Sequence, residues 1–192
     1  MKKKETKNTL SLDPEFYDDQ REDIAMLLFH SVAPSYAFVD DLNHLYNMRL
    51  SRIDDLQLND AAWPLFIHHD PLRQLYFYLI ERPASANTNA PFWTIGHKML
   101  IIIGQLAAST AETIHREFCN ASTPDDPDDI IAASHAALLD EMRSNFTTTT
   151  LLNPSAPPPS TLRGKALRDY NDLFDLTDVI LDTLDIKYIC ND

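Results

Sequence analysis

Glycine is scarce in this sequence, and its scarcity excludes several kinds of binding site. Only three of the 192 residues are glycine, and Gly96, Gly104 and Gly164 do not form a motif. Phosphate-binding loops and dinucleotide-binding turns need closely spaced glycines, because the backbone must approach the phosphates. No serine lies in the glycine-flanked turn that carries a hydrolase nucleophile. We therefore expect no catalytic residue and no cofactor, and the sequence favours a protein that is not an enzyme.

Cysteine is equally scarce, because the chain contains only Cys119 and Cys190. Neither cysteine belongs to a local motif that places a histidine beside it, so neither is expected to be an activated thiol. Unpaired thiols are typical of a reducing compartment, where cysteine behaves as a small apolar residue. We therefore expect a cytoplasmic protein, and a single disulfide between the two cysteines is the alternative.

Long apolar runs and an export signal are also lacking. The longest apolar candidate, Met99–Ala108, is interrupted by Gly104 and Gln105 and is far shorter than the ~20 residues of a membrane helix. Lys2–Lys4 are followed by mostly polar and acidic residues instead of the apolar core of a signal peptide. These features predict a soluble protein with no membrane partner.

Basic residues are too few to balance the acidic ones. The chain has 16 lysines and arginines against 29 aspartates and glutamates, a net charge of −13. Such a field repels nucleic acid and anionic lipid, and it favours solubility and basic partners. The expected partner is another protein or a second copy of this chain, and no nucleic acid.

Hydrophobic residues make up 44% of the chain, which is enough for a folded core. The clearest boundary lies at Pro154–Pro159, where four prolines in six positions exclude a helix interior. Thr147–Thr150, which precede them, are predicted to form a loop. The expected organisation is therefore a disordered arm, an α+β body, a proline-rich connector and a C-terminal amphipathic helix, at residues 1–12, 13–146, 147–160 and 161–192.

Short runs of aromatic and β-branched residues predict strands at about 25–32, 64–69, 74–81 and 98–103. Asp70-Pro71 suits a tight turn, so the second and third runs are expected to form a hairpin. Leu75, Phe77 and Leu79 face one way, while the residues between them are also apolar. This pattern indicates a strand that is covered on both faces.

Helices are predicted at Ser35–Asn47, after the apparent capping box Ser109–Glu112, and from Asp126 to about Arg143. A short helical turn is expected at Pro14–Asp23. The predicted fold class is thus α+β, with a small antiparallel sheet, flanking helices and the C-terminal amphipathic helix. An all-α bundle is the alternative, because 72–82 and 99–119 are long enough to be helices.

The order of these elements resembles that of a known family. Val39–Gln57 reads VDDLNHLYNMRLSRIDDLQ, and it is followed by the hairpin, by Pro91-Phe92-Trp93, by Lys98–Gly104 and by a helix. This order, over about residues 25–120, is similar to the IPExxxDY family of small bacterial proteins, which has no assigned activity. Phe92-Trp93-Thr94 and Lys98-Met99 stand where that family has its signature residues, which are absent here. The resemblance implies an α+β body and no particular chemistry.

His68, His69 and Asp70 form the only concentration of potential metal ligands. Adjacent side chains on a strand point to opposite faces, so we expect no metal to be bound there. An alternative hypothesis is an enzyme or small-ligand site that combines these three residues with nearby aromatic side chains. Those aromatic residues, which are also suited to a core, are Trp63, Tyr76, Phe77, Tyr78, Phe92 and Trp93.

The C-terminal segment carries the strongest helical pattern. Apolar residues recur at steps of three and four, while aspartates occupy the other side. We expect this stripe to be buried on the body or against a second copy; a docking helix for a partner is the alternative. The candidate interaction residues are Tyr170, Leu173, Phe174, Ile180, Leu181 and Leu184. The sequence therefore favours an acidic, non-enzymatic protein–protein interaction or regulatory module.

Overall fold

The computed structural model describes residues 24–31, 33–58, 61–83, 97–119, 130–144, 146–152, 163–164, 179–180 and 182–183. These residues form an antiparallel sheet whose six strands lie in the order β2-β5-β6-β7-β1-β8, and a separate two-stranded sheet, β3-β4. The strands are β1 (Ile24–Ser31), β2 (Ser51–Arg52), β3 (Leu56–Leu58), β4 (Ala61–Trp63), β5 (Leu65–Asp70), β6 (Leu75–Glu81), β7 (His97–Ile103) and β8 (Phe146–Leu152).

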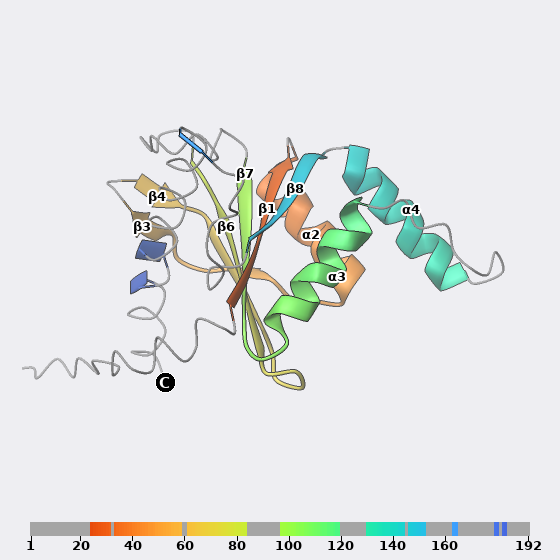
Figure 1. Cartoon of the computed structure of the whole chain (residues 1–192), viewed down its shortest axis with the longest axis horizontal. Helices are drawn as coiled ribbons and strands as arrows, with labels where there is room; N and C mark the ends of the chain where they lie inside the picture. The colour runs from red at the N-terminus through yellow and green to blue at the C-terminus, as the bar shows by residue number, and fades with distance from the viewer. Residues whose placement is uncertain are drawn as a thin grey trace, which may run out of the picture.

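Helices cover one side of the large sheet. They are α2 (Ser35–Tyr46), α3 (Ala107–Cys119) and α4 (Ile130–Ser144), while β3 and β4 lie on the opposite side (Figure 1). The α+β fold class is therefore confirmed, and the alternative of an all-α bundle is wrong. Within the described part of the chain, no helix is long and apolar enough to cross a membrane.

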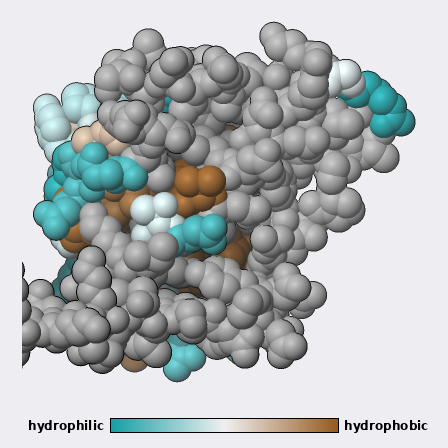
Figure 2. All heavy atoms as spheres, turned by 90° about the vertical axis from the view of Figure 1, so that its left-hand side faces the viewer, coloured by the Kyte–Doolittle hydropathy of each residue, from teal (hydrophilic) through white to brown (hydrophobic). Residues whose placement is uncertain are grey.

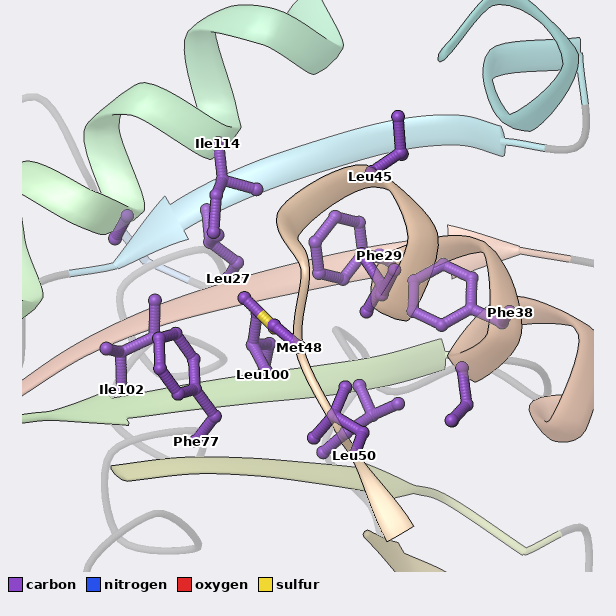
Figure 3. Packing of buried hydrophobic residues seen from close by; sticks show 14 of the residues in the cluster. Leu27, Phe29, Phe38, Leu45, Met48, Leu50, Phe77, Leu100, Ile102 and Ile114 are labelled. Atoms are coloured by element: carbon purple, nitrogen blue, oxygen red, sulfur yellow. The ribbon is translucent and has the colours of Figure 1, made fainter. Parts of the chain in front are cut away.

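The four predicted strands are confirmed as β1, β5, β6 and β7. β1 is an apolar run buried on both faces, whereas β5 is apolar only over its first residues and ends in His68, His69 and Asp70. In β1, Ala25, Leu27 and Phe29 belong to the core beneath the helices, whereas Met26 and Leu28 belong to a second core on the other face. Figure 3 shows the helix-side core. Figure 2 looks at the opposite side of the molecule, where hydrophobic residues gather near the centre.

The predicted hairpin joins β5 to β6 through a turn that Asp70 holds. Its Oδ1 accepts hydrogen bonds from the backbone N–H groups of Leu72 at 3.0 Å and Arg73 at 3.2 Å. Gln74 then adopts a left-handed conformation with φ of 53° and starts the return strand. Gly104, which follows β7, lies against this turn, since a Cβ atom there would be 2.4 Å from the Gln74 carbonyl oxygen.

Two local predictions are wrong. Thr147–Thr150 are not a loop but lie in β8, which pairs antiparallel with β1 along its length. Threonine is β-branched and favours strands, so the first residues of the expected connector extend the sheet. Helix α3 begins at Ala107, so Ser109 is not an N-cap; its hydroxyl donates to the Leu106 carbonyl oxygen at 3.1 Å.

Several predictions lie outside the described residues, and their outcome stays open. They are the N-terminal arm, the turn of helix at Pro14–Asp23, the aromatic pair Phe92-Trp93, the N-cap at Asp126, the connector after Leu152, and most of the C-terminal stripe.

Candidate functional site

An open groove of about 590 Å³ lies on the helix side of the sheet, where α2, α3, α4 and the β5–β6 hairpin meet. Phe77 of β6, Ile114 of α3 and Leu45 of α2, which are labelled in Figure 3, are among the apolar residues that line it. Polar side chains from all of these elements surround the apolar part. The groove therefore combines an apolar floor with a polar rim, the usual construction of a binding site.

Helix α3 and Leu106 just before it form one wall, because two rows of side chains at four-residue spacing face the groove. Leu106, Thr110 and Ile114 make the first row, and Ser109, Thr113 and Glu117 make the second. The Ser109 hydroxyl donates to Leu106 O, and the Thr113 hydroxyl donates to Ser109 O at 2.9 Å. Their hydrogens are thus bonded within the helix, which leaves the hydroxyl oxygens as hydrogen-bond acceptors.

The end of α2 forms the facing wall. Asn47 adopts a left-handed conformation with φ of 50°, and its N–H bonds the Asn43 carbonyl oxygen, so the helix stops there. The Asn43 side chain then fixes the returning chain, accepting from Leu50 N at 2.8 Å and donating to Leu50 O at 3.2 Å. This chain reversal places Tyr46 and Met48 in the groove wall.

Tyr46 and Glu117 join the two walls. The Tyr46 hydroxyl donates to Glu117 Oε2 at 2.9 Å, and the His135 ring of α4 meets the Tyr46 ring edge-on, with 6.3 Å between centroids. Burial, and next the adjacent Glu117 carboxylate, raise the pKa of Tyr46 far above its ordinary value. Tyr46 therefore stays protonated and serves as a permanent donor that orients the Glu117 carboxylate.

The structure separates the His68, His69 and Asp70 cluster. His68 lines the groove and stacks on Phe77 with 5.6 Å between ring centroids, and Asp70 lies at the hairpin end of the same groove. His69 lies on the other face of the sheet and stacks on Tyr76 at 4.3 Å. Among the described residues no group of three or more potential ligands could hold a metal ion. The absence of a bound metal stays a prediction.

Burial lowers the pKa of His68, and the nearby Asp70 carboxylate only partly opposes this effect. His68 is therefore neutral near neutral pH, and the charges on the groove are those of Asp70, Arg73 and Glu117. Arg73 Nε lies 3.7 Å from Asp70 Oδ2, so these two charges face each other at the hairpin end.

The aromatic residues that were expected to form either a pocket or a core divide between these roles. Phe77 lines the groove, whereas Trp63 is fully buried in the core on the opposite face of the sheet. Tyr78 packs against that second core, and Tyr76 is 45% exposed. The expected aromatic pocket therefore consists, in the part of the chain described, of Phe77 with Tyr46. The sequence pattern places Tyr46 on the apolar face of its helix and does not assign it to a pocket.

A thiol–imidazole pair on α3 also escaped prediction from the sequence. Cys119 Sγ lies 3.5 Å from His115 Nε2, one helical turn away on α3, and Cys119 is an exposed free thiol. The prediction that no histidine accompanies a cysteine locally is therefore wrong for Cys119. A four-residue spacing within a predicted helix was the available signal.

A charged pair lies at the other end of β7. Lys98 is 1% exposed, and its Nζ donates to the Ala33 carbonyl oxygen at 2.9 Å and meets Glu81 Oε1 at 3.3 Å. The ammonium group also lies 5.5 Å from the centre of the Phe38 ring. These contacts tie the loop before α2 to the sheet, so the structural role accounts for this buried lysine.

The C-terminal stripe is described at only a few positions. Ile180 is fully buried and belongs to the second core, with Met26, Trp63 and Met99. The Thr183 hydroxyl donates to the Val179 carbonyl oxygen at 2.6 Å, as in a helical turn. Tyr170, Leu173, Phe174, Leu181 and Leu184 lie outside the described residues, so their burial stays a prediction.

Comparisons of this chain with family models, with curated proteins and with solved structures found no match. The resemblance to the IPExxxDY family therefore stays a prediction.

Proposed function

We propose that this protein is a non-enzymatic interaction module, and that the groove between α2, α3 and the hairpin binds a short segment of a protein partner. The observation that carries this proposal is the combination of an apolar floor, a rim rich in acceptors, and exposed leucines at one end. Leu72 is 95% exposed and Leu106 is 49% exposed, and the second of these lines the groove. Exposed leucines beside a groove favour a macromolecular partner, which covers both the groove and its margin.

The dimensions of the groove fit an extended peptide. The wall from Ser109 to Glu117 is about 12 Å long, from the rise of an α-helix. About four residues of extended chain cover the same length. An apolar side chain of the partner would fill the floor beside Phe77 and Ile114, and each such burial contributes roughly 1.5–3 kcal/mol.

The acceptor-rich wall fits the backbone of such a segment. The hydroxyl hydrogens of Ser109 and Thr113 bond backbone carbonyl oxygens, so the hydroxyl oxygens keep lone pairs that can accept hydrogen bonds from a partner. A partner backbone supplies N–H donors at regular intervals, which matches a row of acceptors spaced by one helical turn.

A blocking substitution tests this proposal. Thr113→Trp should fill the groove and weaken peptide binding at least about tenfold, while Ala108→Trp, at an exposed position of the same helix outside the groove, should leave it unchanged. The measurement is fluorescence polarisation with a fluorescein-labelled library of short peptides, on variants whose melting temperatures match the wild type. Equal loss in both variants, or no binding by the wild type, contradicts the proposal.

A small-ligand binding protein or an enzyme that uses the same groove is the second candidate. The groove volume of about 590 Å³ favours it, because small-molecule sites measure roughly 300–1,000 Å³. His68 and Asp70 would then act without His69, which lies on the other face. A small molecule that raises the melting temperature of the wild type but not of Thr113→Trp, with no peptide binding, supports this candidate instead.

A cytoplasmic location is part of the proposal. The exposed free thiol of Cys119 fits a reducing compartment. The net charge of −13 fits a partner that is a basic protein and opposes binding to nucleic acid.

A further inference from the structure

We infer that the group recognised in the groove is a basic side chain, arginine or lysine, whose charged end meets the Glu117 carboxylate. This inference rests on the proposed function and names the chemistry of the partner. The charges that the groove presents do not cancel, and their imbalance points to a cation.

Two carboxylates and one guanidinium line the groove. Arg73 faces Asp70, whose carboxylate also accepts the two backbone N–H groups of the hairpin turn. Glu117 accepts the Tyr46 hydroxyl, and in the described part of the chain no cation lies within ion-pair distance of its carboxylate. The Glu117 end of the groove therefore offers an oriented negative charge that a ligand can neutralise.

Arg143 is a competing cation, whose charge reaches Tyr46 and opposes the rise of its pKa, but the hydrogen bonds of Arg143 go to other acceptors than the Glu117 carboxylate. Its Nη2 donates to the backbone carbonyl oxygen of Glu117, and its Nη1 lies 2.7 Å from Asp140 Oδ1. Arg143 does not line the groove. Its contacts hold the end of α3 against α4 and leave the Glu117 side chain facing Tyr46.

The surroundings of Glu117 suit a long side chain that ends in a cation. Apolar atoms of Leu45 and Ile114 can cover the aliphatic stem, because long basic side chains bury their stems and keep the charge at a polar site. The Tyr46 hydroxyl holds the carboxylate in one orientation, and the His135 ring packs against the Tyr46 ring. Glu117 can accept a further charge-assisted hydrogen bond, which is the strong kind.

The charge of the whole chain acts in the same direction. With 29 acidic against 16 basic residues, the protein attracts basic segments over long range, and the oriented carboxylate then selects the side chain. An acidic or phosphorylated segment would meet repulsion at the same place.

The experiment compares matched peptides that differ only in this charge. Labelled peptides of about four residues carry arginine or its neutral isostere citrulline, and lysine or acetyl-lysine, at each position in turn. Wild-type protein should bind the best basic peptide about tenfold more tightly than its neutral counterpart, and this preference should shrink as salt is raised.

Two variants locate the effect. Glu117→Gln keeps an oxygen acceptor for the Tyr46 hydroxyl but removes the charge, and it should abolish the preference for basic peptides while neutral peptides bind as before. Glu112→Gln removes an exposed charge from the same helix outside the groove, and it should keep the preference. Equal wild-type binding of basic and neutral peptides, or a preference that survives Glu117→Gln, overturns this inference and leaves the proposed function standing. Failure of every peptide to bind contradicts both.

Discussion

Replacing Gly104 with alanine should destabilise the protein by about 3 kcal/mol. Gly104 has φ of 132°, a backbone conformation that side chains with a Cβ rarely adopt. A Cβ there would lie 2.4 Å from the Gln74 carbonyl oxygen and 3.0 Å from Leu75 Cδ2. The obstacle at Gln74 is backbone, so either the hairpin turn or the start of α3 must move.

This substitution should also impair the groove. Gly104 connects β7 to α3 and lies against the turn that carries Asp70 and Arg73, so a shift there changes the distance between the groove walls. The affinity of the groove for its peptide ligand should therefore fall even under conditions in which the Gly104→Ala variant is still folded.

Gly164→Ala is the matched control for this prediction. Its φ of 59° is also positive, but among the described residues, its chain neighbours apart, no atom lies within 4 Å of the position that the added methyl group would take. Conformational strain alone then costs about 1–2 kcal/mol. Urea denaturation of the two variants measures the difference between them, and equal losses of stability would contradict the close contact between Gly104 and the hairpin.

Replacing Ile180 with alanine should cost about 2–5 kcal/mol of unfolding free energy, a loss typical of large-to-small substitutions in cores. Ile180 is fully buried in the second core with Trp63 and Met99, on the face of the sheet opposite the helices. Removing its side chain leaves a cavity there and loses the apolar surface that it covers.

Val179→Ala is the control, because this neighbouring side chain is 47% exposed and its truncation should change stability by no more than about 0.5 kcal/mol. Chemical denaturation compares the two variants. A truncation near Pro157 extends the test to the whole C-terminal segment and should lower the melting temperature at least as much as Ile180→Ala. Similar small effects of both alanine substitutions would show that the C-terminal segment is not part of the folded core.

The central strands could be predicted because each carries a local sequence pattern that is typical of a strand. β1, β6 and β7 are apolar on both faces, which a sheet covered on two sides requires, and Asp70-Pro71 marks the turn between β5 and β6. β8 was not recognised although its threonines favour strands, because they are polar and do not form the apolar run that marks the other strands, and because the strand that β8 pairs with is β1. That partner is far away in the sequence, and local pattern does not reveal it.

The groove was harder to predict than the fold. The four-residue spacing of Ser109, Thr113 and Glu117 is visible in the sequence, but it does not tell which helix end faces them. Tyr46 meets Glu117 only because Asn47 ends α2 and the sheet brings α2 beside α3. Conversely, His68 and His69 attract attention as neighbours in sequence, and the alternation of a strand then separates them.

A titration followed by NMR tests most directly whether the groove is a binding site. The tightest-binding peptide of the library, without fluorescein, is added to ¹⁵N-labelled protein, and the changes in amide chemical shifts are mapped onto the structure. The largest shifts should fall on Thr110, Thr113 and Glu117 of α3, on Tyr46 to Met48 at the end of α2, and on the hairpin turn at Asp70 to Arg73. Amides of β3 and β4, on the opposite side of the sheet, should shift little. Shifts concentrated on β3 and β4, with α3 and the end of α2 unchanged, would contradict the assignment of binding to the groove.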